Sequence, residues 1–244
     1  MLIDYNLVLV LALWLLMLSN FIVLLQPGEG LLFLPVGKAH LHIPSWRAAM
    51  GGKLLVWLNP LRALQPIARV NVFGQAGTDA LSQLTASEKQ LRQLSATTAP
   101  LALAAALLMC VALPAAILMH RNIAFVLSSI ALAYGLYGAA LLLGWRRARK
   151  SVHLPPGIAP AAFEALCCLP YAAQLQRRAS LLMLPCVPLA ELLASDIQLD
   201  AAHLKLLVAR IQDYRAIATE GAQMDMLDTL AALIATRQAQ DGEP

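Results

Sequence analysis

Two histidines, His40 and His42, are the residues of this sequence best spaced to share a metal ion. Side chains two residues apart in an extended strand point to one face, and imidazole is a common zinc ligand. A zinc site needs a third and usually a fourth ligand, and neither His153 nor His203 lies at a diagnostic spacing from the pair. The default interpretation is a polar strand face, with no metal and no cofactor, and metal binding by His40 and His42 is the alternative.

The four cysteines follow no metal or redox spacing. Cys167 and Cys168 are adjacent rather than in a C-x-x-C arrangement, and Cys186 and Cys110 lie far from them in the sequence. Cysteine packs in cores as a small hydrophobic residue, so we expect reduced, buried thiols. A metal or redox set is the alternative interpretation.

Arg177 and Arg178 precede Ser180, a pattern typical of a phosphorylation site beside basic residues. A simpler hypothesis is that both arginines contact lipid phosphates while their apolar neighbours enter the membrane interface. An ordinary solvated helix face is the remaining alternative. No nucleotide-binding, zinc-protease or nucleophile-elbow motif occurs, so the sequence predicts no catalytic residue.

Two long uncharged segments, Leu101–Met119 and Ile123–Trp145, dominate the chain, with 19 and 23 residues. About 20 apolar residues are needed to cross a bilayer core of about 30 Å. The three-residue link between the segments permits only an antiparallel hairpin. Pro114 is expected to kink the first helix and to free a carbonyl near Cys110.

Small residues recur every fourth position in both segments and would let the two helix backbones approach closely. We predict that these rows face each other, although an alanine-rich composition also produces such rows. The rows are Ala102, Ala106 and Cys110 in the first segment, and Ala131, Gly135 and Ala139 in the second.

Positive charge predicts the orientation of the hairpin, because basic residues near membrane ends stay in the cytoplasm. The second segment is followed by Arg146, Arg147, Arg149 and Lys150, and the first is preceded by Lys89 and Arg92. The turn offers only Arg121. We therefore expect both hairpin ends inside and the turn outside.

Tyr5–Leu25 is a third apolar stretch that we interpret as an uncleaved anchor with its N-terminus outside. Three short strands are expected at Leu31–Val36, Ala39–Ile43 and Leu54–Leu58, with irregular structure over Leu61–Gly74. A helix is expected from Thr85 to Pro100, because Thr85 and Glu88 have capping-box spacing.

The residues after the hairpin begin with a basic and proline-rich linker and continue as helices. Two apolar helical regions are expected at 161–180 and 181–194, and Leu181–Leu193 is predicted to serve as a docking surface. Leu204, Leu207, Val208 and Ile211 define the apolar face of a later helix that Gly221 should end, and Leu227, Leu230 and Ile234 define another.

Composition places the chain among membrane proteins. Hydrophobic residues make up 59% and charged residues 13%, about half the usual ~25%. The net charge of +4 is concentrated beside the hydrophobic segments, which suits anionic lipid headgroups rather than nucleic acid. The excess of Arg over Lys indicates a GC-rich bacterial genome.

These observations predict a mainly α integral membrane protein with three transmembrane helices, a small β-containing cytoplasmic region and a cytoplasmic helical domain. The expected parts are an anchor (1–25), a loop region with strands (26–98), the hairpin (99–145), a linker (146–160) and the helical domain (161–244). The predicted location is the bacterial inner membrane, with the C-terminus in the cytoplasm.

The predicted function is a non-catalytic accessory or scaffold protein that contacts membrane lipids and binds a protein partner or membrane complex. One alternative is a membrane enzyme acting on a lipid or lipid-linked substrate, with His40, His42 or His203 as acid or base. The other is a minor transporter subunit.

Overall fold

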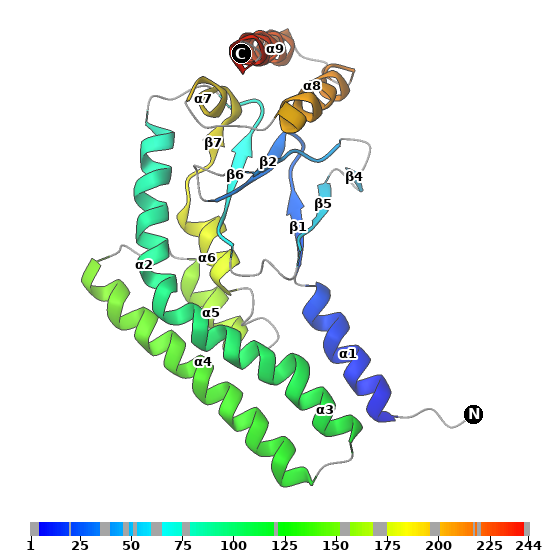
Figure 1. The fold of residues 1–244 in the computed structure, drawn as a ribbon, viewed down its shortest axis with the longest axis vertical. Helices are drawn as coiled ribbons and strands as arrows, with labels where there is room; N and C mark the ends of the chain where they lie inside the picture. Colours follow the sequence, from blue (N-terminus) through cyan, green and yellow to red (C-terminus); the bar gives the residue numbers. More distant parts are fainter. Residues whose placement is uncertain are drawn as a thin grey trace. The chain divides into compact units, whose positions relative to one another are not determined.

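The computed structural model describes thirteen stretches of the chain and is mostly helical within them (Figure 1). These are residues 5–19, 21–34, 40–45, 49–50, 53–59, 65–74, 79–119, 122–151, 157–167, 175–195, 201–216, 218 and 221–241.

The helices in these stretches are α1 (Tyr5–Ser19), α2 (Ala80–Leu107), a π-helical segment (Leu108–Ala112), α3 (Leu113–Leu118), α4 (Ile123–Ser151), α5 (Ile158–Cys167), α6 (Leu175–Met183), α7 (Leu189–Ala194), α8 (Ala201–Arg215) and α9 (Gly221–Asp241). The strands are β1 (Ile22–Leu25), β2 (Glu29–Phe33), β3 (His40–His42), β4 (Ala49–Met50), β5 (Lys53–Trp57), β6 (Ile67–Asn71) and β7 (Val187–Pro188).

The chain folds into two compact units that alternate along the sequence. We call the first the helical unit; it comprises Met1–Ile22, Trp57–Leu64 and Lys89–Met183. The second, the β-containing unit, comprises Val23–Val56, Gln65–Glu88 and Leu184–Pro244. This division differs from the five consecutive parts expected from the sequence, because residues 161–183 belong to the helical unit and later residues to the other.

Two helical segments of the helical unit are long and apolar enough to cross a membrane. They are Thr98–Leu118, which includes the end of α2, the π-helical segment and α3, and Ile123–Ala148 of α4. Figure 1 shows the two running side by side, and α4 contacts both α3 and the π-helical segment. The hairpin geometry expected from the sequence is therefore present.

Helix α2 starts earlier than expected and runs through Pro100. It begins at Ala80, so Thr85 lies inside the helix, where its hydroxyl donates to the Ser82 carbonyl at 2.8 Å. The predicted capping box is wrong. The first turn is instead capped by Glu191 of α7, whose carboxylate accepts a hydrogen bond from the Leu81 N–H at 2.8 Å. A carboxylate at this end also interacts favourably with the helix dipole.

Pro114 changes the hydrogen bonding of the first long segment without ending it. Proline has no N–H, so it cannot donate to the carbonyl four residues earlier, which belongs to Cys110. The residues before it form the π-helical turn, in which the Leu113 N–H donates to the Leu108 carbonyl. The Trp14 indole N–H from α1 donates to the Cys110 carbonyl at 3.1 Å.

The expected third span, Tyr5–Leu25, is not one helix. Helix α1 ends at Ser19, and Ile22–Leu25 forms strand β1, which pairs with β5. Fifteen residues reach only about 22 Å at a rise of about 1.5 Å per residue, short of a bilayer core of about 30 Å. Strand pairing thus overrides the uninterrupted apolar pattern that suggested a longer helix.

A four-stranded sheet with the order β3-β2-β6-β7 forms the core of the β-containing unit. Leu32 of β2 lies opposite Leu41 of β3 and Ala68 of β6, and Val70 of β6 pairs in parallel with Val187 of β7. Strands β2, β3 and β5 overlap the three predicted ones. Strand β6 falls within the stretch expected to be irregular, so that prediction is wrong.

The amphipathic faces of the last two helices are confirmed by their burial. Leu204, Leu207 and Ile211 of α8 are buried, as are Leu227, Leu230 and Ile234 of α9. Gly221 begins α9 rather than ending α8. Within the predicted docking surface Leu181–Leu193, Val187, Leu189, Leu192 and Leu193 are buried in the β-containing unit, whereas Leu182 is exposed.

We expect Trp14→Phe to loosen helix α1, because phenylalanine cannot donate to the Cys110 carbonyl. A hydrogen bond is worth about 1 kcal/mol, so exchange of the α1 amide hydrogens should rise about fivefold in detergent-solubilised protein, measured by mass spectrometry. Trp57→Phe, at an indole that is half exposed, is the matched control. Equal exchange in the two variants would show that the indole does not hold α1.

Candidate functional site

The two histidines lie as the sequence predicted, on the same face of strand β3. Both are exposed, and Leu41 between them is buried. Within the described residues, no group of three His, Cys, Asp or Glu side chains could hold a metal ion. His153 and the side chain of His203 lie outside what the structure describes. His40 and His42 thus occupy an exposed strand face, and metal binding by the pair stays a prediction.

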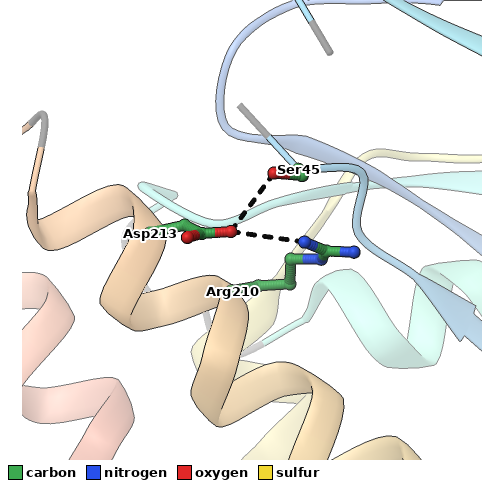
Figure 2. Close-up of polar contacts among 3 residues, drawn as sticks. All are labelled: Ser45, Arg210 and Asp213. Atoms are coloured by element: carbon green, nitrogen blue, oxygen red, sulfur yellow. Dashed lines mark hydrogen bonds and ion pairs between the residues drawn. The ribbon is translucent and has the colours of Figure 1, made fainter. Parts of the chain in front are cut away.

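His42 lies near a polar cluster that connects the segment after β3 to α8. Figure 2 shows Asp213 accepting a hydrogen bond from the Ser45 hydroxyl and an ion pair from Arg210, both at 3.2 Å. Arg210 and Asp213 are three residues apart and therefore share one side of the helix. Although part of the His42 side chain reaches solvent, protein atoms packed around it displace water from the imidazole, and this desolvation together with the positive charge of Arg210 lowers the pKa of His42. The three-residue spacing of Arg210 and Asp213 is the one feature of this cluster that the sequence alone could indicate.

Arg177 points into the helical unit, which corrects its expected role as a lipid contact. Its side chain is only 2% exposed, and it donates to the Asn59 carbonyl at 3.2 Å. The guanidinium lies over the ring of Phe21, 5.5 Å from its centroid, a cation–π arrangement. Burial lowers the pKa of Arg177 to about 10, so the group stays charged at neutral pH.

The neighbours of Arg177 are also engaged inside the chain. Arg178 of α6 forms an ion pair with Glu164 of α5, so its charge is already partnered by a carboxylate rather than by a lipid phosphate. Ser180 is fully buried, and its hydroxyl donates to the Arg177 carbonyl at 2.7 Å. A buried hydroxyl cannot reach a kinase, which excludes the phosphorylation alternative for the folded protein.

The small-residue rows do not face each other. Ala106 of α2 is buried, and Ala102 and Cys110 are partly buried, but Ala131, Gly135 and Ala139 of α4 are exposed. A Cβ placed on Gly135 would meet no atom within 4 Å. The buried side of α4 carries Ala133, Tyr137 and Ala140 instead, because this side buries the large Tyr137 ring.

The basic residues lie where α4 continues beyond its apolar part. Arg146 and Arg147 are exposed, and the Arg147 guanidinium donates to the Gln93 carbonyl of α2 at 3.3 Å. Arg149 and Lys150 belong to the same helix, but the structure describes only their backbone. The first residues of the predicted linker are therefore helical, because α4 extends to Ser151.

Two cysteines differ from the predicted burial. Cys167 and Cys186 are exposed and belong to different compact units, while Cys110 is partly buried. Cys168 lies outside the described residues. Cys167 ends the short helix α5, and a residue at a helix end is less readily enclosed than one in its middle.

A cavity of about 680 Å³ lies within the helical unit and was not foreseen from the sequence. Helix α2 lines it from Leu91 to Ala102, helix α4 from Tyr137 to Ala148, and faces of α5 and α6 complete it. The lining residues carry no charge, and the polar ones are Ser95, Thr98, Tyr137 and Gln176. This volume is typical of small-molecule sites, which fall at about 300–1,000 Å³.

Comparison of the chain with protein-family models, with curated proteins and with solved structures found no match. The structure itself defines a mostly helical protein with some strands and with two helices that could cross a membrane.

We expect the stability of the β-containing unit to depend on pH through His42. A lowered pKa means that unfolding takes up a proton between the folded pKa and the ordinary value of 6.5. The free energy of unfolding should thus be highest above pH 6.5 and should fall as the pH drops through that window. His42→Gln should flatten this dependence in denaturant titrations at several pH values, and Arg210→Gln, which removes one of two causes, should flatten it in part. An unchanged slope in His42→Gln would contradict the assignment.

Proposed function

We propose that this protein is a membrane-embedded accessory protein whose helical hairpin crosses the bacterial inner membrane. The observation that carries the proposal is the low burial of the two long segments, of which only 28% and 22% is enclosed by the chain. Their exposed apolar side chains include Leu103, Val111, Phe125, Leu132 and Leu142. Water solvates such surfaces poorly, whereas lipid chains or neighbouring helices would cover them.

The distribution of charge supports an orientation with both hairpin ends in the cytoplasm. Exposed Lys89 and Arg92 precede the first segment, and exposed Arg146 and Arg147 follow the second. Basic residues at membrane ends favour the cytoplasmic side. In this arrangement α1 enters the apolar layer beside α3 without crossing it, held there by the hydrogen bond from Trp14.

A scaffold role is consistent with the described ion pairs, which connect parts of the chain to each other. The ion pairs Glu29–Arg69, Arg178–Glu164, Arg210–Asp213 and Arg215–Asp228 each join parts of one compact unit. The exposed small row of α4 supports contact with another membrane helix, because Gly135 would let a second backbone approach closely. In the proposal this row binds a partner subunit while lipids cover the remaining faces.

The membrane arrangement is tested with extraction and reporter fusions in a bacterial host. The protein should stay with membranes in alkaline carbonate. Alkaline phosphatase should be inactive when fused after Lys150 and active at Asn122, and a fluorescent protein should be bright after Lys150. Release into the soluble fraction, or active phosphatase after Lys150, would refute the arrangement.

The partner role is tested at Gly135. Purification of the tagged chain in mild detergent should recover a stoichiometric partner, and Gly135→Leu should lose most of it because the side chain blocks close helix approach. Since Gly135 faces open space in the chain itself, the variant should fold normally. Gly135→Ala keeps the row small and serves as the control. A chain recovered alone, or recovered equally well with its partner in both variants, would contradict the accessory role.

A further inference from the structure

We propose that the cavity of the helical unit holds one acyl chain of an anionic phospholipid, with the phosphate headgroup beside Arg146 and Arg147. This inference rests on the proposed membrane insertion of the hairpin and assigns a specific lipid site to it. Three observations carry it: the shape of the cavity along the helices, the absence of charge in its lining, and the basic residues at one end.

The residues that line the cavity are spread along two antiparallel helices, α2 and α4. Thr98 of α2 lies against Gly144 of α4, where an added Cβ would be 3.1 Å from the threonine methyl. This contact fixes the register, so Ala102 and Tyr137 mark one end of the lining and Leu91 and Ala148 the other. The twelve residues from Leu91 to Ala102 span about 17 Å along the helix.

The interior of the cavity suits a hydrocarbon chain. Leucine and alanine dominate the lining, and Met183 and Ile158 add apolar surface from α6 and α5. The Thr98 hydroxyl donates to the Leu94 carbonyl of its own helix at 3.1 Å. Tyr137 lies at the inner end of the lining, and its ring is buried among the surrounding helices. A charged or sugar-like ligand would find no ionic partner among these residues.

Basic residues follow the lining residues of α4 in the sequence near the opposite end of the cavity. Arg146 and Arg147 stand between two lining residues, Trp145 and Ala148, and Arg147 reaches across to the Gln93 carbonyl next to Leu94. Arg92 on α2 is exposed at the same end. In the proposed orientation this end lies at the cytoplasmic headgroup level. Arginines there attract anionic headgroups, which selects phosphatidylglycerol over zwitterionic lipids.

The experiment uses the full chain reconstituted in phosphatidylcholine vesicles that contain a small fraction of photoactivatable lipid. The probe is phosphatidylglycerol with a diazirine on one acyl chain, and phosphatidylcholine with the same chain is the comparison. Mass spectrometry should place the adducts on α2, α4, α5 and α6 around the cavity. Labelling from phosphatidylglycerol should exceed that from phosphatidylcholine by at least about fivefold, the effect expected of one basic residue.

Variants separate the cavity from the general lipid surface. Ala162→Phe fills the cavity and should remove most of the adducts, and Ala179→Phe repeats the test from α6 if the first variant unfolds. Leu166→Phe adds a ring on the exposed side of α5 and should leave labelling unchanged. Arg146→Gln with Arg147→Gln should abolish the preference for phosphatidylglycerol while cavity adducts persist.

Two results distinguish failure of this inference from failure of the proposed function. If the chain stays in carbonate-washed vesicles but both lipids label it equally and Ala162→Phe changes nothing, the lipid only surrounds the hairpin and the cavity inference is overturned. If carbonate removes the chain from the vesicles, the membrane proposal fails and the lipid site fails with it.

Discussion

Backbone hydrogen bonding around Pro114 is the constraint on which the helical unit depends. In the proposed membrane setting no water would reach a carbonyl that lacks an N–H partner, and an unsatisfied buried group costs about 1–3 kcal/mol. Two features compensate for the missing N–H. A π-helical turn precedes the proline, and the Trp14 indole N–H donates a hydrogen bond to the Cys110 carbonyl. The same hydrogen bond attaches α1 to the hairpin, so a local defect in one helix positions another.

In both units, charged side chains form hydrogen bonds with backbone groups that lie far away in the sequence. Glu191 caps the first turn of α2, and Arg237 of α9 donates to the carbonyls of Leu193 and Ser195 at 2.9 and 2.6 Å. Arg177 does the same for Asn59. Each of these residues would suggest a surface or binding role by type alone. Arg177 is buried and the other two side chains are partly buried, so all three charges serve contacts inside the chain.

The proposed function and the proposed lipid site use different sides of α4. On the exposed side, Gly135 has no side chain and would let another helix approach closely. The buried side packs through Tyr137 and borders the cavity near Gly144. One helix can therefore contact a partner and a lipid at once without competition. Both proposals use the basic end of α4, for the orientation of the hairpin in one and for a lipid phosphate in the other.

The sequence determined those features that depend on local pattern. Uncharged length identified the two long segments, and helical periodicity identified the buried faces of α8 and α9. Alternation and composition found β2, β3 and β5, and β3 does carry His40 and His42 on one face. Only the tertiary structure decided which side of α4 is buried, why α1 stops at Ser19, and that Arg177 lies inside. These outcomes depend on contacts between distant residues: the bulk of Tyr137, the pairing of β1 with β5, and the carbonyl of Asn59. Local pattern carries no information about such partners. The cavity could not be predicted for the same reason, because residues of four helices line it.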